Sequence, residues 1–173
     1  IANVGDMENW GLEFELGWKQ SVGEFNYAVS ANASYLKNKL INLGNETGEQ
    51  IYENAGASGV GSYVKGMNGD VFPYFYGYKT DGLFQNQTEV DAYVNADGEK
   101  YQSAALPGDV RFVDLNGDGV ISDADKTKIG KGMPDWTYGL TLSADWKGVD
   151  LNLFFQGTIG NDVFDFSQRG DIP

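Results

Sequence analysis

The sequence predicts an all-β fold, a fragment of an antiparallel transmembrane β-barrel in which two long hairpins are joined by a long structured external loop. Three observations lead to this fold class: four runs of apolar–polar alternation, the length of those runs, and the aromatic residues near their ends. An alternation with a period of two places alternate side chains on opposite faces of a strand. Each run is therefore expected to be a strand with one apolar face.

The first barrel hairpin is predicted within residues 1–40. In MENWGLEFELGWK, every even position of 10–18 is apolar, and in EFNYAVSANASYLK every odd position of 25–35 is apolar. Only QSVG separates the two runs. A connection this short predicts an antiparallel hairpin.

The second barrel hairpin opens the stretch 136–173, which ends in the start of a further external loop. In WTYGLTLSADW the even positions of 136–146 are apolar, and in VDLNLFFQGTI the odd positions of 149–155 are apolar. Lys147-Gly148 between them predicts a two-residue turn.

Strand length and aromatic placement favour a membrane barrel over a soluble sheet. Soluble strands run about 5–6 residues, whereas outer-membrane strands need roughly 9–11. Ten residues tilted by roughly 40° project to about 25 Å, the height of the apolar band of such a barrel. A soluble β-sandwich alternates as well and stays open as an alternative. The aromatic pairs that bracket the apolar faces are Trp10 with Trp18, Phe25 with Tyr35, and Trp136 with Trp146.

The region 41–135 is predicted to be an extracellular loop, because outer-membrane barrels combine short periplasmic turns with long external loops. A loop of this length is expected to carry structure of its own. Its Gly-, Asn- and Ser-rich first part predicts turns and short strands, and QTEVDAYVNADG predicts a short helix that ends at Gly98.

An EF-hand-like calcium loop is predicted at residues 114–125, DLNGDGVISDAD. Oxygen-bearing side chains occupy loop positions 1, 3, 5 and 12, and Gly119 stands where such a loop turns sharply. Hard oxygen ligands suit calcium, which we expect to have a structural rather than a sensory role. The candidate ligands are Asp114, Asn116, Asp118, the backbone carbonyl of Val120, Ser122 and Asp125.

An aromatic cluster in VFPYFYGYKTDGLF has two interpretations. Its rings either face a ligand, by stacking on sugars, or form a small hydrophobic core that orders the loop. The core interpretation is favoured, because clustered aromatic residues usually pack together. The residues concerned are Tyr74, Tyr76, Tyr78 and Phe84.

Composition excludes several function classes. Twelve basic and 25 acidic residues give a formal charge of −13, which disfavours a nucleic-acid partner. Histidine and cysteine are absent, so the chain contains no residues for a zinc site, a histidine triad, a cysteine nucleophile or a disulfide. No catalytic constellation is found, and we expect no enzyme activity. No apolar stretch reaches the roughly 18 residues of a transmembrane helix.

The run PGDVRFVDLNGDGVISDADKTKIGKGMPDWTYGLTLSADWKGVDLNLFFQGTIGNDVF, preceded by FYGYKTDGLFQ, resembles the C-terminal barrel region of SusC/RagA-type TonB-dependent outer-membrane transporters of Bacteroidota. MENWGLEFELGWK and the hairpin that follows also match that region, so the resemblance covers nearly the whole chain. It implies a barrel of about 22 strands around a plug. It also implies a SusD-like surface lipoprotein as partner, TonB-driven nutrient uptake of glycans or peptides, and a location in the outer membrane of a Gram-negative bacterium.

Four strands cannot close a barrel, and open edges cannot lie in lipid with unpaired N–H and C=O groups. The chain is therefore expected to be a fragment that contacts outer-membrane lipid, with the plug and the TonB-contacting parts lying elsewhere. The alternative is a secreted calcium-dependent binding module, dockerin-like or a carbohydrate-binding β-domain. A dockerin needs two calcium loops, and burial of the apolar faces against a second sheet would favour such a module.

Overall fold

A computed structural model describes residues 5–52 and 63–165 of the chain. The chain divides into two compact units, which we describe separately. The first unit comprises Ile1–Tyr52, Val64–Tyr74 and Gly130–Pro173, and the second comprises Glu53–Tyr63 and Phe75–Ile129. Within the described residues, no helix has the length and apolar character needed to cross a membrane.

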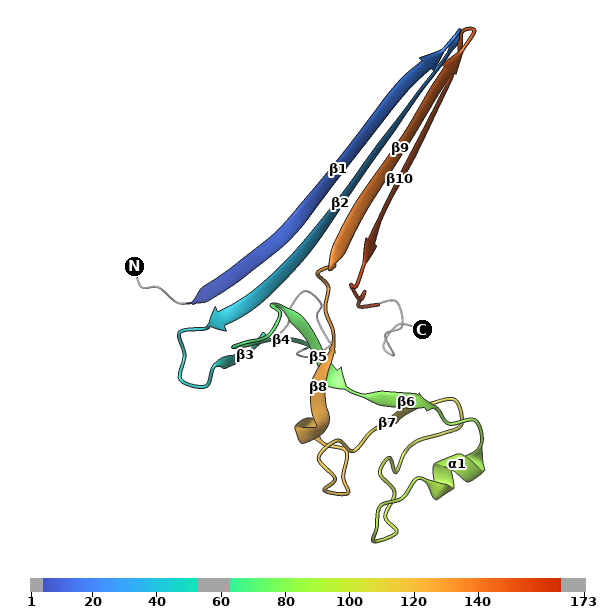
Figure 1. Ribbon diagram of the computed structural model, residues 1–173. Helices are drawn as coiled ribbons and strands as arrows, with labels where there is room; N and C mark the ends of the chain where they lie inside the picture. The colour runs from blue at the N-terminus through green and yellow to red at the C-terminus, as the bar shows by residue number, and fades with distance from the viewer. Residues whose placement is uncertain (1–4, 53–62, 166–173) are drawn as a thin grey trace. The chain divides into compact units, whose positions relative to one another are not determined.

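The first unit is built on a four-stranded antiparallel sheet with the strand order β1-β2-β9-β10 (Figure 1). Its strands are β1 (Asp6–Val22), β2 (Phe25–Asn42), β9 (Trp136–Trp146) and β10 (Val149–Ile159). They contain 17, 18, 11 and 11 residues, all beyond the usual length of a soluble strand. The predicted all-β barrel-type architecture is confirmed, with β1 and β10 as the open edges of the sheet.

Two tight turns join the strands of the two hairpins, and both lie at the same end of the sheet (Figure 1). Val22 pairs with Phe25, so the first turn consists of Gly23 and Glu24. β1 thus runs further into the predicted QSVG turn than expected. The second turn has positive φ at both Lys147 (52°) and Gly148 (84°), as a type I′ hairpin turn requires.

The register of the strands places the alternating apolar residues of β1, β2, β9 and β10 on one face of the sheet. Leu16 pairs with Ala31, Ala31 with Leu140, and Leu140 with Phe155, so these four residues form one row across the sheet. Because side chains alternate with a period of two, the same register places the polar sets together on the opposite face.

A small core lies at the far end of β2 from the turns. Leu40 is 5% exposed, and its backbone N–H donates to the carbonyl of Asp70 over 2.8 Å. The side-chain amide of Asn38 donates to the carbonyl of Phe72. The hairpin of β3 (Glu49–Tyr52) and β4 (Val64–Met67) belongs to this part of the unit.

In its described residues, 63 and 75–129, the second unit consists of short strands, one α-helix and turns. β5 (Tyr74–Tyr78) lies beside β8 (Lys126–Gly130), and β6 (Thr80–Leu83) pairs antiparallel with β7 (Val110–Phe112). A single 3-10 turn, η1 (Asp123–Asp125), precedes β8.

The helix α1 (Gln87–Ala92) ends six residues before the predicted end at Gly98. The side chain of Asn95 accepts hydrogen bonds from the backbone of Asp97 (3.0 Å) and Glu99 (2.9 Å), which forms a turn in place of another helical turn. Gly98 has φ +83°, which the turn requires. The prediction of helix for residues 93–98 was therefore wrong.

Candidate functional site

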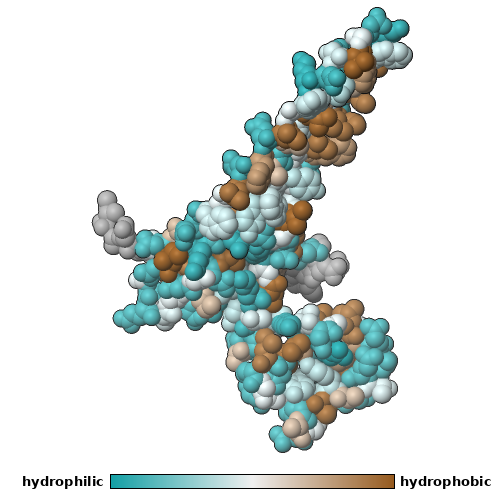
Figure 2. Space-filling model, viewed as in Figure 1, coloured by the Kyte–Doolittle hydropathy of each residue, from teal (hydrophilic) through white to brown (hydrophobic). Residues whose placement is uncertain are grey.

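The apolar face of the long sheet is its most extensive surface feature. The side chains along β1 are strongly exposed, from 50% at Trp10 to 71% at Leu16. In Figure 2, brown apolar residues gather along these long strands. Large contiguous apolar surfaces of this kind mark a contact with protein or membrane. The other exposed members are Leu12, Phe14, Trp18, Phe25, Trp136, Tyr138, Trp146, Leu151, Leu153 and Phe155.

Two aromatic rows bound this apolar band. At the end away from the turns, the ring of Tyr35 lies 5.6 Å from Trp10 and 4.8 Å from Trp136. At the turn end, Phe25 pairs with Trp146 across the strands. The rows are ten residues apart along β2 and β9, which projects to about 25 Å in a tilted strand.

Trp18 differs from the expectation that it brackets the apolar face of β1. It pairs with Val29, well inside the band. The reason is that β1 continues four residues beyond it to Val22, so the end of the strand lies further on.

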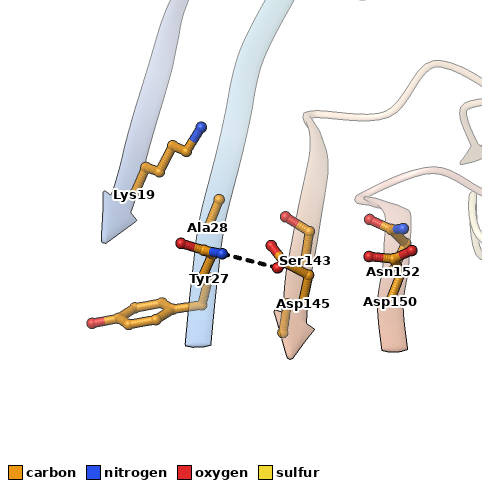
Figure 3. A pocket seen from close by; sticks show the side chains of 9 residues that line it. Lys19, Tyr27, Ala28, Ser143, Asp145, Asp150 and Asn152 are labelled. Atoms are coloured by element: carbon orange, nitrogen blue, oxygen red, sulfur yellow. Dashed lines mark hydrogen bonds between the residues drawn. The ribbon is translucent and has the colours of Figure 1, made fainter. Parts of the chain in front are cut away.

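The opposite face of the sheet is mainly polar, with the exposed Phe154 as an exception, and near the turns it contains a hollow of about 280 Å³ (Figure 3). Asp145 and Asp150 stand directly opposite each other on β9 and β10. The amide of Asn26 donates to Asp145 over 2.9 Å, the bond drawn in Figure 3. Lys19 also lines the hollow. In a transmembrane barrel, a polar face opposite an apolar band is the lumen face.

The predicted calcium loop is closed by its own hydrogen bonds. The carboxylate of Asp114 accepts from the backbone N–H of Gly117 (2.7 Å) and of Gly119 (2.8 Å). Asp118 accepts from the side-chain amide of Asn116 (2.9 Å) and from the backbone N–H of Val120 (2.9 Å). The first half of the loop is thus folded around its acidic side chains.

Asp125 ties the end of the loop to its beginning. Its side chain is fully buried and accepts from the backbone N–H of Ser122 (2.7 Å) and of Leu115 (2.8 Å). The hydrogen bond from Ser122 is the largest cause of the lowered pKa of Asp125, and burial opposes it. The hydroxyl of Ser122 caps η1 by accepting from Ala124 over 3.2 Å.

The donor set of the loop suits a hard cation. Asn116 and Asp118 lie at the surface, while Asp125 is held by backbone N–H groups. No three acidic, histidine or cysteine side chains gather as a metal site within residues 5–52 and 63–165. Calcium also takes amide and backbone carbonyl oxygens, so Asn116 and Val120 belong to the set to be tested.

The predicted aromatic residues divide by burial. Phe84 and Tyr74 are 1% and 4% exposed, whereas Tyr76 and Tyr78 are half-buried. Phe84 packs edge-on against Tyr93 at 5.6 Å. Phe84 and Tyr74 thus lie in the interior of the fold.

Tyr78 connects the aromatic residues to the end of the calcium loop and to Lys126, which follows it. Its hydroxyl donates to Asp123 over 3.1 Å, and the ammonium of Lys126 lies 5.2 Å from its ring centroid. Lys126 also forms an ion pair with Asp123 at 2.8 Å, which is the main cause of the lowered pKa of that carboxyl. Burial raises the pKa of Tyr78.

Sequence reasoning missed three further aromatic residues of this unit, Tyr93, Tyr101 and Phe112. Tyr93 and Tyr101 pack against each other with centroids 4.9 Å apart, and Tyr78 lies 5.2 Å from Phe112. The signal was present in NADG, a turn sequence that places the residues flanking it side by side. Interpreting that segment as helix concealed the pairing.

Known proteins similar to the chain are TonB-dependent receptors. It is 31% identical to TonB-dependent receptor P3 of Formosa agariphila over 96% of its own length, and 31% identical to receptor P26 of the same bacterium over 98%. It is 26% identical to TonB-dependent receptor SusC of Bacteroides thetaiotaomicron over 94%. The chain belongs to the TonB-dependent receptors.

The fold of this TonB-dependent receptor segment also has a solved counterpart. A structure of the RagAB peptide importer in its open-open state matches 91% of the chain with a TM-score of 0.63 and 18% identity. The segment spans 16% of the length of P3 and P26, and 15% of the RagAB chain. No established family profile matches it.

Proposed function

We propose that the chain is part of an outer-membrane importer whose long sheet lies in the barrel wall. The observation that carries this proposal is the exposed apolar band bounded by two aromatic rows, with a polar face behind it. Outer-membrane barrels have this outward band, these girdles and a polar interior. The relatives of this chain are named TonB-dependent receptors, which supports the same role.

The open edges support a place within a larger barrel. β1 and β10 each have one unpartnered edge in the sheet, and unpaired backbone groups in lipid cost several kcal/mol each. Neighbouring strands from the rest of the receptor would pair with these edges. The segment would then contribute four strands to the wall and no transport path by itself.

We assign substrate and partner from the relatives. The transporter would take up glycans or peptides, with energy from the TonB complex acting through parts of the receptor outside this segment. The second unit would face a SusD-like surface lipoprotein or the substrate. The similarity to SusC and to a peptide importer supports these assignments.

Tryptophan depth tests the membrane location. All four tryptophans of the segment lie on the apolar face, with Trp146 in a girdle and Trp18 inside the band. In the intact receptor reconstituted with brominated phospholipids, Trp18→Phe should remove fluorescence quenched best by bromines deep in the acyl chains. Trp146→Phe should remove fluorescence quenched best by bromines near the headgroup. If neither brominated lipid quenched the fluorescence of Trp18 or Trp146, the placement of the sheet in the membrane would be contradicted.

Uptake tests the importer role. A strain that lacks the receptor gene, grown on a neutral polysaccharide or on a peptide mixture as sole carbon source, should lose growth on one of them. Restoring the gene should restore growth. Unchanged growth on both, with the receptor shown to be in the outer membrane of the parent strain, would count against import of these two substrate classes.

The alternative of a secreted calcium-dependent module predicted that a second sheet covers the apolar faces. Those faces are instead open, with Phe14 57% and Leu12 53% exposed. A soluble sandwich would lose much of its stabilisation with such a face in water, since burial of apolar area is the main favourable term. This alternative is therefore not supported.

We further propose that loop 114–125 binds calcium with a structural role. Asp114, Asn116 and Asp118 bring oxygen atoms to the first half of the loop, and Asp125 holds its end beside Leu115. The bound ion would hold the loop in one conformation before β8.

Calorimetric titration of the intact receptor in detergent, after chelator treatment, tests this. Calcium should bind once per segment, and Asp118→Ala should abolish or strongly weaken binding. Asp97→Ala, which removes an acidic residue outside the loop, is the control. Equal uptake by the parent protein and Asp118→Ala, or no uptake by either, would overturn the calcium proposal.

A further inference from the structure

The second unit contains an open groove that no role described so far uses. It has a volume of about 590 Å³, within the range of small-molecule sites. The rings of Tyr78, Tyr101 and Phe112 line it together with Ile121. Tyr101 is half-buried and packs against Tyr93, which holds its ring in place at the groove. The groove therefore has a wall of positioned aromatic rings.

β7, the strand beside the groove, cannot pair with an additional strand at its outer edge. The side-chain amide of Gln102 donates to the carbonyl of Val110 (3.0 Å) and accepts from the N–H of Phe112 (2.8 Å). These are the backbone groups that an added strand would use. The carbonyl of Phe112 accepts from the hydroxyl of Tyr93. Because β7 has its edge groups satisfied in this way, an extended peptide cannot bind here by strand addition.

Hydroxyl and carboxylate groups lie among the rings. The hydroxyls of Tyr101 and Ser103 make no hydrogen bond within the described residues, and both residues line the groove. Asp109 lines it too, and its Oδ2 accepts from the backbone N–H of Leu106 over 2.8 Å. A ligand rich in hydroxyl groups would find both donors and acceptors beside the aromatic wall.

The charges around the groove do not favour an anion. Lys126 is paired with Asp123 at 2.8 Å, and Arg111 with Asp81 at 2.6 Å. Among the described residues that line the groove, the charged one is Asp109, which is negative. A sulfated or uronic sugar would meet repulsion from this carboxylate, and no lysine or arginine is among the described residues that line the groove.

We propose that this groove binds a neutral saccharide, with its sugar rings against Tyr101 and Phe112 and its hydroxyls on Ser103, Asp109 and the Tyr101 hydroxyl. Apolar sugar faces suit aromatic rings, and polar groups at the rim fix the orientation. The inference deepens the proposed import function by naming a substrate class and a binding place on this segment. Binding of the saccharide to the groove does not depend on whether the receptor imports it.

Binding is tested with the intact receptor in detergent. The probes are cellohexaose, xylohexaose and mannohexaose, together with hexagalacturonate and an uncharged ten-residue peptide. At least one neutral hexasaccharide should bind in calorimetry or saturation-transfer NMR, more tightly than the uronate or the peptide. No binding of any neutral probe, or equal binding of the uronate or the peptide, would overturn the proposal.

Variants locate the site. Tyr101→Ala should weaken binding of the saccharide about tenfold, the scale of one lost ring contact, while Tyr101→Phe, which keeps the ring, should lose less. Ser103→Ala should weaken it by a smaller factor without disturbing the fold, since Ser103 is exposed. Tyr76→Ala, two residues before Tyr78 and outside the groove lining, is the control. Saccharide binding unchanged in Tyr101→Ala would show that it occurs elsewhere and would overturn the assignment.

The two proposals fail separately. If the uptake experiment is negative but a neutral hexasaccharide binds with the expected dependence on Tyr101, the groove proposal stands and the import proposal falls. If uptake is lost on gene deletion while no neutral saccharide binds, import stands and the groove proposal falls.

Discussion

The long sheet and the second unit of this segment are stabilised by different means. The sheet keeps one register over whole strands, and its side chains meet mainly as rows on two faces. The second unit has short elements held by side chains that bond to backbone groups, as Gln102, Asn95 and Asp125 do. A substitution in the sheet should therefore act through the face it occupies, and one in the second unit through the bonds it removes.

The largest effect is expected for a charge placed on the apolar band. Leu142 pairs with Val29 and Leu153 midway between the aromatic rows. Leu142→Arg should destabilise the intact barrel in lipid by about 2–4 kcal/mol, the cost of Arg near the bilayer midplane. Denaturant unfolding in liposomes measures it.

The neighbouring residue is the matched control. Thr141 is on the polar face of the same strand, so Thr141→Arg introduces the same charge without contact with lipid. It should cost far less than Leu142→Arg. Equal losses for the two variants would mean that the faces do not differ in environment, and the contrast between lipid and lumen faces would be lost.

Much of the long sheet could be predicted, because one physical constraint determines it. Alternation fixes which face each residue occupies, and the turn at Lys147-Gly148 has a sequence that fits its geometry. The end of β1 was misplaced because Gln20, Ser21 and Val22 continue the pairing after the apolar alternation stops. Hydrogen bonds of the backbone, rather than apolar pattern, decide where that strand ends.

The candidate sites of the second unit were less predictable. The calcium loop has its ligands in one short sequence, so spacing suffices to propose it. The groove draws Tyr78, Tyr101 and Ile121 from three separate segments. The bond of Gln102 to β7 likewise depends on the path of the chain between them. No local pattern encodes such contacts, which require the tertiary structure.

The second-largest effect, after that of Leu142→Arg, is expected when the carboxylate of Asp125 is removed. Asp125→Ala leaves the backbone N–H groups of Leu115 and Ser122 without their acceptor inside the loop. In calcium-free buffer, hydrogen exchange of these two amides should accelerate roughly a hundredfold, because the loop opens more readily once these donors have lost their buried acceptor. Asp118→Ala, at an exposed position of the same loop, should leave both amides protected. Equal acceleration in the two variants would contradict the closing role of Asp125.

A smaller effect is expected for Gln102. Gln102→Leu keeps the volume but removes both bonds to β7, at a cost of about 1 kcal/mol. Exchange of the Phe112 amide should accelerate about fivefold, while the long sheet should be unaffected. Gln85→Leu, whose side-chain amide bonds to the carbonyl of Leu83, is the control that leaves β7 intact. An unchanged Phe112 amide in Gln102→Leu would contradict the assigned role.

The smallest effect is expected at the turn between β9 and β10. Lys147 forms an exposed ion pair with Glu24 of the other turn at 3.4 Å, and such pairs contribute about 0–1 kcal/mol. Its φ of 52° is one that asparagine adopts more readily than lysine. Lys147→Asn should therefore leave the free energy of unfolding within about 0.5 kcal/mol of the parent, since the two small terms oppose each other. Lys147→Val loses the same charge and places a β-branched residue at positive φ, so it should be the less stable of the two. If Lys147→Asn proved as costly as Lys147→Val, the ion pair rather than the backbone conformation would be what the turn needs.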